Sequence, residues 1–143
     1  MSQKVKIVAC GTFDLIHPGH IAFLKKAKNL SENSELIVVV ARDITVVKEK
    51  RKRPILNEKE RLEIVSSLKF VDKAILGSKT DKLEIIEKLK PDILVLGYDQ
   101  KWNERRLEKE LRRKGLKTKV IRLERYGNFS SSLLRKRIVR RYA

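Results

Sequence analysis

The chain contains very little cysteine and histidine. Cys10 is its one cysteine, and His17 and His20 are its only histidines among 143 residues. A single cysteine excludes an internal disulfide and a zinc site built from several cysteines, and it is typical of proteins in a reducing compartment. Zinc bound by the two histidines would need carboxylates as further ligands, which is an uncommon structural set. We assign no residue as a metal ligand.

Long apolar runs are also missing. No uncharged stretch reaches the roughly 18 residues that a membrane span needs, and no apolar stretch of signal-peptide length precedes Gly11. We therefore expect a cytoplasmic protein without a membrane partner. The length suits one hydrophobic core, and no linker or repeat divides the sequence. We expect residues 1–143 to form a single domain.

Acidic residues are outnumbered by basic ones. The chain has 35 Lys and Arg against 18 Asp and Glu, a net charge of +17, and residues 101–143 hold 16 of the basic residues but only 4 acidic ones. Such a surplus favours a polyanionic partner: nucleic acid, an acidic membrane or a ligand with several phosphates. A nucleic-acid-binding module remains a distant alternative, because Glu interrupts the basic run "NERRLEKELRRK" and no aromatic residues punctuate it as a stacking surface would. We expect no nucleic-acid partner.

Short runs of Val, Ile and Leu are plentiful. Five of them predict strands, over residues 4–10, 35–41, 71–77, 91–97 and 118–123. Their nearly continuous apolar character is typical of parallel strands that are covered on both faces. Helices are predicted between and after them, over 18–30, behind the cap pair Asn57 and Glu60, and over 81–90, 103–115 and 130–141. This alternation predicts an α/β fold, a Rossmann-like doubly wound sheet of about five parallel strands with helices on both faces.

The segment "VVKEKRKRP" (46–54) places five basic residues in six positions and is predicted to be a loop. A solvated surface loop and a ligand-binding loop both fit this composition.

The segment "GTFDLIHPGH" (11–20) lies between the first predicted strand and a helix that begins near Pro18. Ligands of such sheets bind beyond the carboxyl ends of the strands, and a helix start offers N–H groups to an anion. His17 and His20 could both contact the same anion, and Gly19 would let a ligand approach the backbone. Taken singly, each histidine could instead be a helix cap or an ordinary core residue.

The same segment resembles the GxFDxxHxGH signature of the cytidylyltransferase-like nucleotidyltransferase superfamily. "FSSSLLRKRI" (129–138) is similar to the second signature of that superfamily, ISSTxIR, and the resemblance covers nearly the whole chain. It implies transfer of a nucleoside monophosphate from a nucleoside triphosphate to a phosphate-bearing acceptor, with release of pyrophosphate. A class I aminoacyl-tRNA synthetase fragment shares the HxGH pattern, but the KMSKS-type loop and room for an anticodon domain are absent.

The resemblance also implies the site residues. His17 and His20 would donate hydrogen bonds to phosphate oxygens in the transition state, and Asp14 would hold the turn or contact a metal-bound water. The nucleotide-binding residues of this turn would be Gly11, Thr12, Phe13, Asp14 and Gly19. Ser131, Ser132 and Arg135 would bind the β and γ phosphates, and Lys48 would be a catalytic phosphate-binding lysine. A divalent metal, Mg²⁺, would accompany the triphosphate.

The acceptor is indicated by "GYDQ" (97–100). This stretch, with "ARD" (41–43) and "RKRPILNEKER" (51–61), resembles the compact archaeal FAD synthases, which implies ATP and FMN as substrates. Tyr98 would then offer a stacking face to a ring, and Asp99 would accept a hydrogen bond from ribose or base. The alternative is a glycerol-3-phosphate or other alcohol-phosphate cytidylyltransferase that uses CTP. The resemblance further implies a homodimer, whereas the cysteines that some archaeal FAD synthases carry near the C-terminus are absent here.

Overall fold

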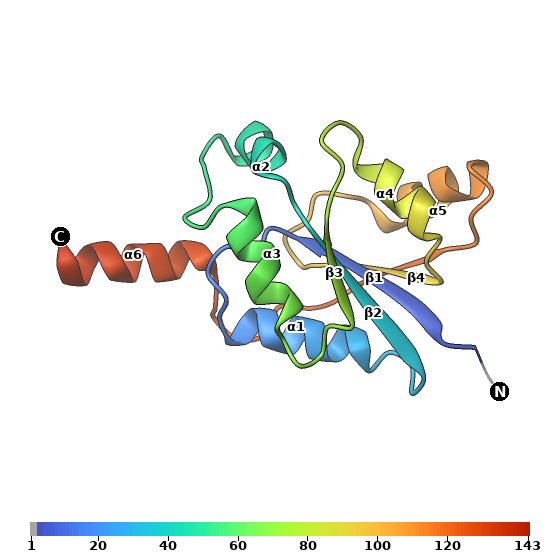
Figure 1. Ribbon diagram of the computed structural model, residues 1–143, viewed down its shortest axis with the longest axis horizontal. Coiled ribbons are helices and arrows are strands. Elements are labelled where there is room, and N and C mark those ends of the chain that lie inside the picture. Colours follow the sequence, from blue (N-terminus) through green and yellow to red (C-terminus); the bar gives the residue numbers. More distant parts are fainter. Residues whose placement is uncertain (1–2) are drawn as a thin grey trace.

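The computed structural model describes residues 3–143 and arranges them as one twisted sheet between helices (Figure 1). The strands are β1 Val5–Gly11, β2 Ser34–Val40, β3 Lys73–Leu76, β4 Ile93–Leu96 and β5 Lys119–Arg122. The helices are α1 Pro18–Lys28, α2 Asp43–Lys50, α3 Glu58–Ser66, α4 Lys82–Leu89, α5 Glu104–Arg113 and α6 Ser131–Tyr142. The strand order is β3-β2-β1-β4-β5, and every neighbouring pair is parallel. The predicted doubly wound α/β sheet is confirmed.

The two faces of the sheet have separate cores because successive side chains of a strand point to opposite faces. Ile7 and Ala9 of β1 pack with α1 and α3, whereas Val8 and Cys10 pack with α4 and α5. Figure 1 shows α1 and α3 on the lower left side of the sheet and α4 and α5 on its upper right side. Both faces are covered, which explains why the strands are apolar runs without alternation.

The prediction of a loop over residues 46–54 was wrong for its first half. Residues 43–50 form α2, and Arg51, with a left-handed φ of 56°, ends it. The Glu58 carboxylate accepts a hydrogen bond from the Asp43 N–H and so satisfies a donor at the helix start. Val46 is the only buried residue of this short helix, so apolar periodicity gives almost no signal for it.

Helix α6 extends away from the rest of the molecule (Figure 1). None of its residues is buried. Its first turn nevertheless contacts the β1–α1 loop, because the Ser131 hydroxyl donates to the Leu15 carbonyl and accepts from the Leu15 N–H. Within residues 3–143, no helix is both long and apolar enough to cross a membrane.

Arg61 of α3 is completely buried and connects two loops with the start of α2 at the carboxyl edge of the sheet. Its guanidinium donates to the carbonyls of Leu56 and Thr12, at 3.0 and 2.7 Å, and to the Asp43 carboxylate at 2.7 Å. A buried charge is tolerated only when its hydrogen-bonding groups are satisfied, and here carbonyl oxygens and a carboxylate supply the partners.

We predict that Arg61→Met lowers the free energy of unfolding by about 3 kcal/mol, because it leaves three partly buried acceptors without their donor. Urea unfolding followed by circular dichroism measures the change. Lys59→Met, at an exposed position of the same helix, is the matched control and should change stability by less than about 0.5 kcal/mol. Equal stability of the two variants would contradict the connecting role of Arg61.

Candidate active site

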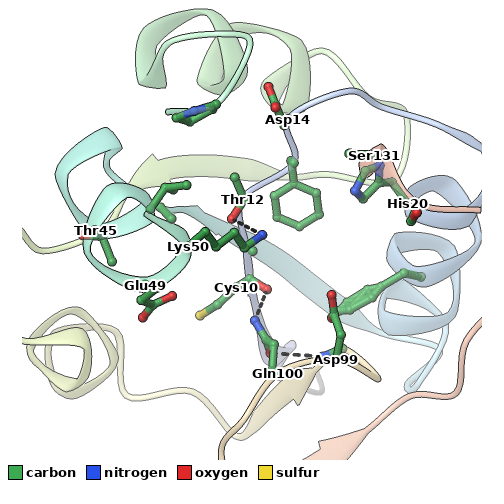
Figure 2. A pocket seen from close by; sticks show the side chains of 18 of the residues that line it. Cys10, Thr12, Asp14, His20, Thr45, Glu49, Lys50, Asp99, Gln100 and Ser131 are labelled. Carbon is green, nitrogen blue, oxygen red and sulfur yellow. Dashed lines mark hydrogen bonds between the residues drawn. The ribbon is translucent and has the colours of Figure 1, made fainter. Parts of the chain in front are cut away.

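A cavity of about 830 Å³ opens at the carboxyl edge of the sheet, within the size range of ligand sites (Figure 2). A residue at or just beyond the end of each strand lines it: Gly11, Ala41, Gly77, Gly97 and Leu123. Its basic lining residues are Arg42, Lys50, Lys52, Arg53, Lys82, Lys101, Arg125 and Arg135, against the acidic Asp14, Glu49, Asp99 and Glu124. This imbalance suits an anionic ligand.

His17 and His20 cap the start of α1 reciprocally. His17 Nδ1 accepts a hydrogen bond from the Gly19 N–H at 3.0 Å, and His20 Nδ1 accepts one from the His17 N–H at 3.2 Å. The two rings stack with their centroids 3.8 Å apart. Each imidazole therefore has one nitrogen engaged by the backbone, and both rings line the cavity.

These hydrogen bonds fix the tautomer of both rings. A neutral imidazole whose Nδ1 accepts a hydrogen bond carries its proton on Nε2. Partial burial lowers the pKa of His17, and burial, followed by the charges of His17 and Lys50 and opposed by Asp14, lowers the pKa of His20 to about 4. Both rings are neutral at pH 7, and each keeps one Nε2–H donor for a ligand.

Two glycines make room for the rings of this turn. A Cβ on Gly19 would lie 2.8 Å from Cε1 of His17 and 3.2 Å from Cβ of Phe129. A Cβ on Gly11 would lie 2.8 Å from the ring of Phe13, which is buried and has a positive φ of 55°. Only glycine permits the observed placement of His17 and Phe13, because a methyl group would force either ring to move.

Asp14 holds the turn in place. Its carboxylate accepts hydrogen bonds from the N–H groups of Ile55 and Leu56, both at 2.9 Å, and lies 3.5 Å from the Arg135 guanidinium. It is 5% exposed. Asp14 thus connects the β1–α1 turn with the α2–α3 loop and with α6.

The first turn of α6 brings three serines to the cavity. Ser130, absent from the predicted set, caps the helix by accepting from the Leu133 N–H at 3.1 Å. Ser132 accepts from the Arg135 guanidinium at 2.9 Å. Both of these residues and Ser131 line the cavity with Arg135, so the two predicted signature segments meet there although more than a hundred residues separate them.

The loop that contains Tyr98 and Asp99 also reaches the cavity, and two polar residues fix its course. Gln100 donates from its side-chain amide to the Cys10 carbonyl at 3.0 Å (Figure 2), and Arg122 donates to the carbonyls of Gly97, Gln100 and Trp102. Tyr98 is half exposed, and the guanidinium carbon of Arg125 lies 5.2 Å from its ring centroid. The Arg125 guanidinium therefore covers one face of the Tyr98 ring in a cation–π contact.

Lys48, which the resemblance implies as a phosphate-binding lysine, is not among the residues that line the cavity. Two residues along an α-helix turn the side chain by roughly 200°, so Lys48 and Lys50 point to opposite sides of α2. Lys50 lines the cavity, with Nζ 3.5 Å from Oγ1 of Thr12 (Figure 2). Because the sequence predicted a loop here, it gave no helical phase that would place either lysine relative to the cavity.

The comparison with known proteins agrees with this geometry. The family described as cytidylyltransferase-like matches residues 8–137. The chain belongs to the cytidylyltransferase-like family. It is 52% identical to the FAD synthase of Aciduliprofundum boonei, over 87% of this chain and 81% of that one, and 51% identical to the FAD synthase of Archaeoglobus profundus, over 94% and 86%. A solved structure from Thermoplasma volcanium, described as a lipopolysaccharide core biosynthesis protein, is 42% identical with a TM-score of 0.81, and the match covers 87% of this chain and all of that one.

Sequence patterns alone did not identify Arg61 and Arg122, which hold loops beside the cavity in place. Arg61 occupies the buried stripe of α3, four positions before the buried Val65. A charged residue in an otherwise apolar stripe is the signal that could have revealed it. Arg122 lies in a strand and gives no such signal, because its partners are backbone carbonyls of a distant loop.

We predict that His20 titrates with a pKa of about 4, well below the usual value near 6.5. Between these two values the unfolded chain binds a proton that the folded chain does not, so stability is lost as the pH falls through this window. Histidine-selective NMR measures the titration, and the chain contributes only two imidazoles to the spectrum. The ring should remain in the Nε2–H tautomer at pH 6. Titration of both rings near 6.5 would contradict the capping arrangement.

Proposed function

We propose that this chain transfers AMP from ATP to FMN and releases FAD and pyrophosphate. The observation that carries the proposal is the pair of neutral imidazoles, each with its Nδ1 engaged and its Nε2–H available, in a cavity rich in basic side chains. The choice of ATP and FMN is supported by about 50% identity to archaeal FAD synthases over most of the chain.

The reaction needs donors rather than a strong base. The FMN phosphate is already anionic at neutral pH, so one of its oxygens can attack the α-phosphorus of ATP directly. The new P–O bond forms as the bond between the α-phosphorus and the bridging oxygen breaks, and pyrophosphate leaves with that electron pair. His17 and His20 donate through Nε2–H to the oxygens on which negative charge grows.

The surrounding groups hold the two substrates in line. Backbone N–H groups of residues 11–13 bind phosphate oxygens in this proposal, and the start of α6 binds the β and γ phosphates through Ser131, Ser132 and Arg135. Lys50 takes the phosphate-binding role that the sequence assigned to Lys48. The charge of the Lys50 ammonium helps to lower the pKa of His20, and Nζ lies near Thr12.

A divalent cation, Mg²⁺, enters with the triphosphate. Phosphate oxygens and water are the ligands that Mg²⁺ prefers. Asp99 and Glu124 line the cavity and would receive its water ligands, because the Asp14 carboxylate already accepts two backbone hydrogen bonds. The cation would supply charge neutralisation at the leaving pyrophosphate. Association into a homodimer stays a prediction.

We predict pyrophosphate release in the presence of Mg²⁺ with ATP and FMN together, and FAD as the product. A crossed assay offers ATP or CTP with FMN, glycerol-3-phosphate, phosphocholine or 4′-phosphopantetheine. Release with CTP and a small alcohol phosphate, and none with ATP and FMN, would overturn the choice of substrates. The proposed role of the histidines as donors to phosphate oxygens would not be affected by that result.

We predict that His17→Asn lowers kcat by about 10²- to 10³-fold, because the Nε2–H donor is lost. An asparagine oxygen replaces Nδ1 as a helix cap, so the free energy of unfolding should change little. His17→Ala removes cap and donor together and should lower kcat equally, with about 1 kcal/mol less stability. Lys59→Met, at an exposed position outside the cavity, is the control and should retain wild-type kcat. Wild-type turnover in His17→Asn would rule out the donor role.

A further inference from the structure

The backbone ladder between β1 and β4 stops short of a bond that the other ladders make. Val40 of β2 pairs with Leu76 of β3, and the next residue, Gly77, donates its N–H to the Val40 carbonyl at 2.9 Å. The β1–β4 register continues in the same way to Cys10 and Leu96, so the Gly97 N–H would donate to the Cys10 carbonyl. The Gly97 N–H donates elsewhere.

The side-chain amide of Gln100 takes both positions of the missing bond. Its Oε1 accepts from the Gly97 N–H at 3.0 Å, and its Nε2 donates to the Cys10 carbonyl at 3.0 Å (Figure 2). Two hydrogen bonds in series thus replace one. The ends of β1 and β4 are separated by an additional amide group, while both backbone groups keep a partner.

Glutamine is the residue whose chemistry fits this position. Its amide carries one acceptor and one donor group in a plane, as a peptide unit does. Asparagine has the same amide but is one methylene shorter, an ionised glutamate has acceptors alone, and lysine has donors alone. A side chain of another type would leave the Gly97 N–H or the Cys10 carbonyl without its partner.

The backbone of Gln100 is held as firmly as its side chain. Its N–H donates to the Gly97 carbonyl at 3.3 Å, which closes a turn over residues 97–100. Arg122 of β5 donates to the carbonyls of Gln100 and Gly97, at 2.8 and 2.7 Å. The turn therefore directs the amide back towards β1.

The location gives the inserted amide a consequence for ligands. The chain order of the sheet reverses between β1 and β4, and ligands of doubly wound sheets bind in the crevice at such a point. Beyond β1 the chain enters the turn of residues 11–20, and beyond β4 it enters the loop with Tyr98 and Asp99. Residues of both segments line the cavity.

We propose that Gln100 is a positioning residue, whose side-chain amide acts as an inserted peptide unit and sets the width of the crevice between β1 and β4. This inference rests on the proposed function. Gln100 acts through the Cys10–Gly11 peptide, because a donor on the Cys10 carbonyl fixes the plane of the peptide from which the turn begins. The amide thereby aligns groups of the two segments on which the bound substrates depend.

The kinetic test uses two variants of Gln100 and a matched control. Gln100→Glu keeps the length and the acceptor but loses the donor to the Cys10 carbonyl, and Gln100→Met has neither group. Both should lower kcat of pyrophosphate release from ATP with FMN by about 10- to 100-fold, because small misplacements of reacting groups slow transfer. KM for each substrate should stay within about threefold. Gln3→Glu, the same change at an exposed position, should retain wild-type kcat.

The inserted amide can also be observed directly in the wild-type protein. The chain has two glutamines, Gln3 and Gln100, so a spectrum with glutamine labelled at its side-chain nitrogen contains two NH₂ signals. The side-chain protons of Gln100 should exchange with solvent at least roughly tenfold more slowly than those of the exposed Gln3, because one of them is held by the Cys10 carbonyl.

The outcomes separate this inference from the proposed function. Wild-type kcat in Gln100→Met would overturn the positioning role, as would a large rise in KM for one substrate at unchanged kcat, which indicates a direct contact. Equal exchange rates of the two glutamines would refute the inserted amide. If the wild type releases no pyrophosphate from ATP with FMN, the proposed function fails, and the exchange measurement still tests the amide. Circular dichroism of each variant excludes loss of fold as the cause.

Discussion

The reciprocal capping of His17 and His20 is the interaction on which the site depends. The start of α1 must satisfy backbone N–H groups that have no partner within the helix, and here two imidazole nitrogens accept two of them. The same hydrogen bonds place the ring protons on Nε2, and burial keeps both rings neutral. The same hydrogen bonds therefore cap the helix and leave two Nε2–H donors for a ligand. A residue that caps the helix but has no such N–H would preserve the fold and lose the catalytic activity.

Three polar residues hold the neighbouring segments against this pair. The Asp14 carboxylate accepts hydrogen bonds from the α2–α3 loop and lies beside the Arg135 guanidinium. Ser131 connects α6 to the carbonyl of Leu15, and Arg61 donates to the carbonyl of Thr12. Each contact joins segments that are distant in sequence. Preorganised donors stabilise a transition state only if they do not reorganise during the reaction. The buried Arg61 serves this end although a buried charge adds little to stability by itself.

The sequence predicted the parts of the molecule that depend on local pattern. Apolar runs located the strands, and the order of the elements predicted a parallel sheet. The segment at 11–20 was placed at a strand end, where the structure has it. Helix α2 was missed because Val46 is its one buried residue, so the sequence could not tell which side chains of residues 43–50 face the cavity. The role of Arg61 arises from contacts across the fold, which no local pattern records.

The most direct test of this account is a crystal structure with Mg²⁺, FMN and α,β-methylene ATP, which cannot release pyrophosphate. The account predicts that Nε2 of His17 and of His20 lies within hydrogen-bonding distance of phosphate oxygens, while each Nδ1 still accepts its backbone N–H. A complex in which either ring has rotated to present Nδ1 to the phosphates, or in which the triphosphate lies away from the start of α1, would contradict it.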